Sequence, residues 1–245
     1  FFKTFSLQIK PTTIDLHHYK IKAQTVANET TIINNVADLF IEVIDQKFSI
    51  VLLHYAPHPD VAAIKQTLDK NPSFKIESYH IDAFKKNVKE YHCVILHQLP
   101  TAKHPVTDIL ELCKQQNISV LFITGKPESA EKLNQLGIQQ IKNHRNQYNE
   151  VLPFINESFT LFNLSNETQQ FIQRYPPLTA LYGEYNNTSA QILFYQKIKG
   201  VATNNPLWFF TENNAQKIAV INGENIFRWR LLEYAHTENN RAFDE

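Results

Sequence analysis

The chain has 245 residues, and its 24 lysine and arginine residues balance 24 aspartate and glutamate residues, so the formal net charge at neutral pH is zero. Without an excess of positive charge the chain has no field that would hold a polyanion, which excludes nucleic acid as an expected partner. No apolar run reaches the roughly 20 residues that cross a bilayer. The sequence contains no methionine, so we expect a fragment of a longer protein, with any membrane anchor outside this chain.

Residues 1–45 show the alternation of apolar and polar side chains that is typical of half-exposed antiparallel strands. The alternation covers 5–9, 16–26 and 36–44, and Pro11 marks a turn between the first two segments. About three or four strands of this kind are too few to close a sandwich core by themselves. We therefore expect residues 1–45 to be part of a β-sandwich and residues 46–245 to form a separate domain.

From residue 48 onward, continuously apolar segments alternate with segments of helical periodicity. The predicted strands cover 48–55, 74–81, 91–99 and 118–124, and the predicted helices cover 60–70, 106–116 and 129–136. Strands that are apolar on both faces and alternate with helices indicate a parallel sheet covered on both sides. The expected fold is therefore an α/β, doubly wound, mainly parallel sheet in which 48–55 lies next to 91–99.

The last hundred residues are less regular, and 149–162 cannot be assigned from its pattern. Ser165 is expected to cap a helix over 165–175, and 190–199, 207–211 and 217–222 are expected to be strands in hairpin order at one edge of the sheet. Gly223 then precedes a helix predicted over 224–236.

The start of that last helix is the most distinctive segment of the sequence. Glu224 or Asn225 is expected to satisfy an exposed amide in its first turn. Helical spacing predicts a core face made of Phe227, Leu231 and Tyr234, and the ring of Phe227 or Trp229 is expected to pack against the sheet. The alternative is that the charged and aromatic triplet at 228–230 forms a surface for a protein partner.

Two resemblances follow from these segments. The run ETTIINN at 29–35 and the strand after it resemble the last strands of immunoglobulin-like adhesion modules. The remainder resembles the class I glutamine amidotransferase-like fold of large membrane-anchored bacterial envelope proteins, through IVLLHYAPHPD at 50–60, CVILHQLP at 93–100 and KIAVINGENIFRWRLLEY at 217–234. The resemblance implies a location in the bacterial cell envelope, on the periplasmic face.

Active amidotransferases of this fold place a cysteine at a tight turn between a strand and a helix, and a histidine and a carboxylate near the end of a late strand. In this chain the corresponding turn is FITGKP at 122–127, without cysteine or serine, and the late strand ends in Gly223, Glu224 and Asn225. A carboxylate without a nucleophile and a base cannot carry out acyl transfer. We therefore predict no catalytic residues, and expect Cys93 and Cys113 to be buried apolar residues.

The pair Gly125 and Lys126 after a strand invites comparison with a phosphate-binding loop. Such a loop needs several glycines, and the whole chain has 5. Pro127 also removes a backbone donor from this turn. An ordinary connection between a strand and a helix is the preferred interpretation, and no cofactor is predicted.

Five residues define a candidate ligand-binding crevice at the carboxyl ends of the strands: His54, His58, His97, Lys126 and Glu224. In a flavodoxin-like strand order the first and third strands are neighbours, so His54 and His97 would meet at the topological switch point. Three imidazoles could bind zinc. Polar strand-end residues that bond to loop backbone are the preferred interpretation, because Asp60, the nearby acid, is expected to cap its own helix.

Three hypotheses for the function follow. The first is a non-catalytic interaction or structural module that contacts a protein partner or other domains of the same polypeptide. The second is a hydrolase or transferase that uses His54, His97 and Glu224, and the third is binding of a small polar ligand in the same crevice. An enzyme requires these three groups to converge within hydrogen-bond reach at an accessible cleft.

Overall fold

The structure is a computed structural model that describes residues 9, 11, 13–24, 35–43, 47–186, 190–213 and 215–245, without the side chains of 143–146. The chain divides into two compact units, Phe1–Lys47 and Phe48–Glu245. Nearly all of the predicted strand at 5–9, and all but the last residue of the run at 29–35, lie outside the described residues. None of the described helices is long and apolar enough to cross a membrane.

The described part of the first unit is a pair of antiparallel strands, β1 (Leu16–Lys22) and β2 (Val36–Glu42). Leu16 lies opposite Glu42, and Lys22 lies opposite Val36. These strands fall within the predicted segments 16–26 and 36–44, so the prediction of strands in these two segments is confirmed. Two strands alone bury little apolar surface, and the Phe40 side chain is 62% exposed.

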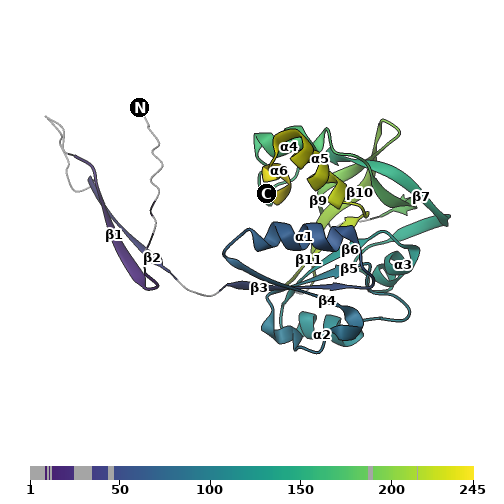
Figure 1. Ribbon diagram of the computed structural model, residues 1–245, viewed down its shortest axis with the longest axis horizontal. Coiled ribbons are helices and arrows are strands. Elements are labelled where there is room, and N and C mark those ends of the chain that lie inside the picture. The colour runs from purple at the N-terminus through teal and green to yellow at the C-terminus, as the bar shows by residue number, and fades with distance from the viewer. Residues whose placement is uncertain are drawn as a thin grey trace. The chain divides into compact units, whose positions relative to one another are not determined.

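The second unit is built on one nine-stranded sheet with the order β4-β3-β5-β6-β11-β10-β9-β7-β8 (Figure 1). The strands are β3 (Phe48–His54), β4 (Phe74–His80), β5 (Cys93–His97), β6 (Ser119–Thr124), β7 (Ile141–Ile155), β8 (Leu178–Tyr185), β9 (Gln191–Ile198), β10 (Val201–Asn213) and β11 (Gln216–Asn222). The helices are α1 (Pro59–Asp69), α2 (Thr107–Gln115), α3 (Pro127–Gln135), α4 (Asn166–Ile172), α5 (Phe227–Thr237) and α6 (Arg241–Asp244), with short 3-10 turns at Ile81–Ala83 and Val88–Glu90.

The first five strands of this order are parallel and follow the flavodoxin-like arrangement, 2-1-3-4-5 in chain order. β3 and β5 are parallel neighbours in which His54 pairs with His97, which confirms the predicted pairing of 48–55 with 91–99. The topological switch point therefore lies between the carboxyl ends of these two strands. β11 is the last strand of the predicted hairpin series and joins the sheet as the fifth parallel strand, beside β6.

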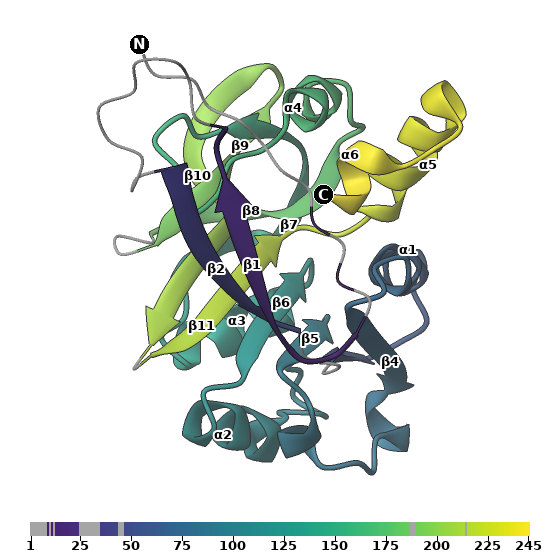
Figure 2. The same ribbon diagram turned by 90° about the vertical axis from the view of Figure 1, so that its left-hand side faces the viewer.

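Helices cover both faces of the parallel half, as its continuously apolar strands predict. Successive side chains of β3 point to opposite faces of the sheet. Ile50 and Leu52 belong to the core cluster on one face, and Val51 and Leu53 to the cluster on the other. The first cluster receives side chains from α1, α4, α5 and α6, and the second from α2 and α3. Figure 2 shows α1 and α5 on one side of the sheet and α2 on the other.

The antiparallel half was only partly predictable. β9, β10 and β11 follow one another in hairpin order as expected, but β7 and β8 were not predicted. β7 is rich in asparagine and other polar residues, contains Pro153 and changes register between Asn143 and Tyr148, so it shows no clear strand periodicity. The helix at α4 was predicted correctly, and Ser165 Oγ accepts the Thr168 N–H at 3.1 Å.

Two expectations about α5 are wrong. The helix begins at Phe227 rather than at 224, and Leu231 and Tyr234 are exposed rather than in the core. The buried face is formed by Ile226, Trp229 and Glu233. Periodicity missed it because Glu233 is charged; its carboxylate is satisfied internally, accepting hydrogen bonds from the Tyr175 hydroxyl and from the backbone N–H groups of Ala242 and Phe243.

Candidate functional site

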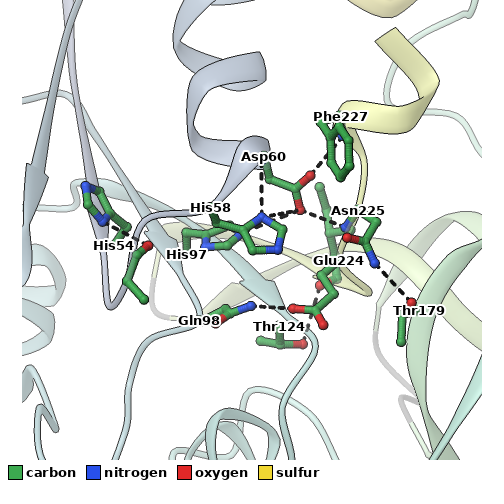
Figure 3. A network of polar contacts seen from close by, with 12 residues as sticks. His54, His58, Asp60, His97, Gln98, Thr124, Thr179, Glu224, Asn225 and Phe227 are labelled. Carbon is green, nitrogen blue, oxygen red and sulfur yellow. Dashed lines mark hydrogen bonds and ion pairs between the residues drawn. The ribbon is translucent and has the colours of Figure 1, made fainter. Parts of the chain in front are cut away.

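The carboxyl ends of β3, β5, β6 and β11 carry a group of polar side chains at the switch point. His54 ends β3, His97 ends β5, and His58 lies immediately before α1. Glu224 follows β11, where its backbone N–H and C=O pair with those of Thr179 in β8. Figure 3 shows His58, His97 and Asp60 gathered together, with Glu224 and Gln98 beside them and His54 to one side.

His58 rather than Asp60 caps α1. His58 caps α1, because its backbone is extended and its Nδ1 accepts a hydrogen bond from the Asp60 N–H at 3.2 Å. Pro59 then occupies the first helical position, where a missing N–H costs nothing. The expectation that Asp60 caps its own helix is therefore wrong.

Asp60 instead caps α5. Its carboxylate is fully buried, Oδ2 accepts the N–H of Asn225 at 2.8 Å, and Oδ1 accepts the N–H of Phe227 at 2.8 Å. A negative charge is favourable at the amino terminus of a helix, where backbone donors are unpaired. The expectation that Glu224 or Asn225 satisfies this turn is wrong, because a carboxylate on a different helix does so.

A compact group of three possible metal ligands is formed by His58, Asp60 and His97. Asp60 Oδ2 lies 3.4 Å from His58 Nδ1 and 3.5 Å from His97 Nε2, and the two imidazole centres are 4.8 Å apart. His97 is fully buried, and neither of its ring nitrogens has a hydrogen-bond partner among the described residues. Burial lowers the pKa of His58, with further lowering from His97 and Lys126, while Asp60 and Glu224 act in the opposite direction.

Glu224 fills the turn between β6 and α3. A Cβ atom on Gly125 would lie 2.8 Å from both Cγ and Cδ of Glu224, so residue 125 has no room for a side chain unless Glu224 moves. The Glu224 carboxylate is held in place by the Nε2 group of Gln98, a residue with a left-handed backbone (φ 54°). Thr124 is buried, and its hydroxyl donates to Asn222 Oδ1 at 3.2 Å.

His54 and Lys126 make contacts of their own at the edge of the group. His54 Nδ1 lies 3.1 Å from the carbonyl oxygen of Ala56, and burial lowers the pKa of this imidazole. The Lys126 ammonium lies 5.5 Å from the centre of the Tyr55 ring. Of the five residues predicted for the crevice, His58 and His97 are brought into contact, Lys126 and Glu224 are near enough to influence His58, and His54 is satisfied by backbone.

The groups of the alternative enzyme hypothesis make separate contacts, although His97 lies near enough to His54 to contribute to the lowering of its pKa. In the described part of the chain, no hydrogen bond or ion pair joins His54, His97 or Glu224 to one another. Cys113 lies within the core and Cys93 is partly buried against it, and burial raises the pKa of both thiols to about 12. A cavity of about 470 Å³ is lined by residues of β7, of the end of β9 and of the turn between β9 and β10, which include Tyr148, Leu152, Lys197 and Gly200. The charge of Glu224 contributes to the raised pKa of Tyr148, after the larger effect of burial.

Sequence reasoning missed the two side chains that organise this site, Asp60 and Gln98. Both were visible as polar residues next to the histidines, since Asp60 follows His58 by two positions and Gln98 follows His97 directly. Their partners, Phe227 and Glu224, lie more than a hundred residues further along the chain, so no local pattern reveals these bonds.

No protein-family model and no curated protein matches this sequence. Among solved structures, the chain is similar to the exo-β-1,4-mannosidase Op5Man5 from an Opitutaceae bacterium, with a TM-score of 0.51 and 10% identity over 82% of this chain and 35% of the mannosidase. The chain thus spans about a third of the length of that enzyme.

Two further neighbours are a glutamine amidotransferase from Thermotoga maritima, with a TM-score of 0.43 and 11% identity over 79% of this chain and 85% of that one, and a ThuA-like protein from Bacteroides uniformis, with a TM-score of 0.39 and 12% identity over 83% and 98%. The strand order and the helices on both faces of the sheet make the protein an α/β protein.

Proposed function

We propose that this chain is a non-catalytic, amidotransferase-like module that serves as an interaction or structural domain of a larger protein. The observation that carries the proposal is the contact between Gly125 and Glu224. The turn after β6 is where the resemblance would place a nucleophile, and here the position is a glycine whose space is taken by a carboxylate fixed by Gln98.

Neighbouring groups do not supply a substitute nucleophile. The Thr124 hydroxyl is buried, and its described hydrogen bonds go to Asn222 Oδ1 and the Ile221 carbonyl oxygen rather than to an imidazole that could act as its base. The thiols of Cys93 and Cys113 have pKa values raised to about 12, which keeps them protonated and unreactive at neutral pH. These features favour a module without acyl-transfer chemistry.

The rival enzyme hypothesis requires His54, His97 and Glu224 to act on one substrate atom. His54 bonds to the backbone of its own loop, and Glu224 bonds to Gln98, so neither is directed at His97. Binding of a small polar ligand at the same strand ends is the stronger alternative, because His58 is partly exposed there, with a side-chain exposure of 20%.

The setting of the module in a larger protein rests on two considerations. In the mannosidase, a region of similar fold makes up 35% of a larger chain, so the fold is compatible with being one part of several. The immunoglobulin-like character of the first unit, the envelope location and a partner within the same polypeptide come from the sequence resemblance alone and belong to this proposal.

The proposal is tested by assaying the purified chain for ammonia release from glutamine and for covalent labelling by an electrophilic glutamine analogue, followed by intact mass. We expect no turnover and no adduct. The matched control carries Cys93→Ala and Cys113→Ala together, and it should behave in the same way. Ammonia release that disappears in this double variant would contradict the non-catalytic assignment.

A further inference from the structure

The unpartnered imidazole of His97 calls for an explanation. A buried polar group without a hydrogen bond destabilises the fold. His97 is fully buried, and neither of its ring nitrogens has a hydrogen-bond partner among the described residues. We propose that His58, Asp60 and His97 form a binding site for a divalent transition-metal ion, best suited to Zn²⁺. The proposal goes beyond the proposed function, because a module without a nucleophile can still bind a metal ion.

Two of the three separations between the ligand atoms match a tetrahedral site. Zinc bonds to nitrogen and oxygen of about 2.0–2.2 Å imply distances of about 3.3–3.5 Å between neighbouring ligand atoms of a tetrahedron. The distances from Asp60 Oδ2 to His58 Nδ1 and to His97 Nε2 are 3.4 and 3.5 Å. All three ligand atoms lie within 4.8 Å of one another. His58 Nδ1 also accepts the Asp60 N–H, so binding a metal ion through this nitrogen requires the His58 ring to turn away from that N–H.

The chemistry of the three donors favours the same ions. Two imidazoles and one carboxylate form a ligand set that suits zinc and neighbouring first-row metals better than magnesium or calcium, which prefer oxygen ligands throughout. Glu224 lies close enough to His58 to act on it electrostatically and adds a second negative charge near the site. The negative charge of these carboxylates would stabilise a bound cation.

The surrounding structure positions the ligands before a metal ion arrives. The Asp60 carboxylate is fixed by the backbone N–H groups of Asn225 and Phe227, and His97 is fixed by its place at the end of β5. Such outer contacts orient metal ligands in known sites. His58 provides access from solvent, because its side chain is 20% exposed while the other two side chains are fully buried. The group of three leaves one tetrahedral position for water or another ligand.

The test is a titration of the chelator-treated full chain with Zn²⁺ by calorimetry, and with Co²⁺ by visible absorption, which reports tetrahedral coordination directly. We expect one tight site per chain. The decisive variant is His58→Asn, because asparagine preserves the helix cap of α1 but removes the imidazole. Loss of outer contacts alone weakens metal sites by about 10–100-fold, so removal of a ligand should weaken binding by at least about 100-fold.

The matched control is His54→Asn, the same substitution at the same edge of the sheet but outside the group of three. It should leave the affinity for Zn²⁺ unchanged, and weak binding by surface histidines should appear equally in both variants. His97→Gln is a second test, and if that variant fails to fold, as judged by its thermal melt, His58→Asn decides alone. Absence of tight binding to the unmodified chain, or equal binding by His58→Asn, would overturn the proposal.

The outcome is separable from that of the proposed function. Ammonia release is measured with and without added Zn²⁺, whereas metal binding is read from heat and absorption. A chain that binds Zn²⁺ but releases no ammonia supports both proposals, and a chain that releases ammonia but binds no Zn²⁺ contradicts both.

Discussion

The Oδ1 atom of Asp60 accepts a hydrogen bond from the backbone N–H of Phe227 at 2.8 Å, joining residues that are 167 positions apart in the chain. Through this bond, α1 supplies the cap of α5, whose own first residues offer no side-chain cap. The same carboxylate lies between two imidazoles at the switch point. The start of α5 and the geometry of the candidate site therefore depend on one side chain.

Replacing Asp60 by alanine should destabilise the protein by about 2–4 kcal/mol, because two backbone donors lose a charged acceptor within the core. Asp60→Asn should cost less, since one acceptor oxygen remains. Urea unfolding at neutral pH measures both changes. Asp69→Ala is the control on the same helix: its exposed carboxylate forms an ion pair with Lys65, and its loss should cost less than about 0.5 kcal/mol. Equal costs for Asp60→Ala and Asp69→Ala would show that the cap contributes nothing.

Trp229→Ala should cost about 3–5 kcal/mol, as expected for the loss of a large buried aromatic side chain. The indole is 4% exposed, stacks on Tyr175 with ring centres 4.9 Å apart, and donates its Nε1–H to the Pro176 carbonyl oxygen. Tyr234→Ala on the same helix should change stability by no more than about 0.5 kcal/mol, because its side chain is 56% exposed. A larger loss in Tyr234→Ala than in Trp229→Ala, measured by thermal melting, would contradict this assignment of the core face.

The parallel half of the sheet could be predicted because its strands are buried on both faces and therefore read as continuous apolar runs. The strand order brings His54 and His97 together at the switch point, as that pattern implied. β7 and β8 could not be predicted, because their stability comes from pairing within a mixed sheet and their sequences are polar or interrupted.

The candidate site was predictable in its location but not in its bonds. The resemblance and the strand ends pointed to His58 and His97, yet Asp60 was assigned to the nearer helix. From the sequence alone, an acid at the start of a helix is expected to cap that helix. The backbone N–H groups of Asn225 and Phe227, which Asp60 in fact accepts, come near it only in the folded chain. The buried face of α5 was missed for a related reason, because a satisfied charge such as Glu233 can lie in the core.

Gly125→Ala should destabilise the protein by about 1–2 kcal/mol, since the added methyl group would overlap the Glu224 side chain. The cost should be smaller when Glu224 is already alanine, because the space is then free. Urea unfolding of the two single variants, the double variant and the unmodified chain gives the coupling energy, which we expect to be at least about 0.5 kcal/mol. Additive effects would show that Glu224 does not occupy this turn in solution.

The thiols of Cys93 and Cys113 should be inert in the native protein at pH 7.5. Burial raises the pKa of each to about 12, so the reactive thiolate form is scarce and access is limited. Incubation with iodoacetamide, followed by intact mass, should show no modification of the native chain and two modifications after denaturation. Rapid alkylation of either native cysteine would contradict the burial of that thiol.

Glu77 should make stability depend on pH in the acid range. Hydrogen bonds from Lys86 at 2.8 Å, Tyr91 at 2.5 Å and Tyr79 at 3.2 Å favour its charged form and lower its pKa from 4.5 to about 2. A carboxyl group whose pKa is lower in the folded protein than in the unfolded chain stabilises the fold above the unfolded pKa. This stabilisation is lost as the pH falls from about 4.5 towards about 2.

The full pKa shift of Glu77 overstates its contribution to stability, because the Lys86 side chain that pairs with it is 44% exposed and screened by solvent. We expect the Glu77 carboxylate to contribute roughly 1–2 kcal/mol at pH 7, with part of it lost by pH 3. The measurement is urea unfolding of the unmodified chain and of Glu77→Gln at pH 7, 5 and 3. Glu77→Gln should be less stable at pH 7 and should approach the unmodified chain as the pH falls. A constant difference between the two proteins at all three pH values would show that the ionisation of Glu77 is not linked to folding.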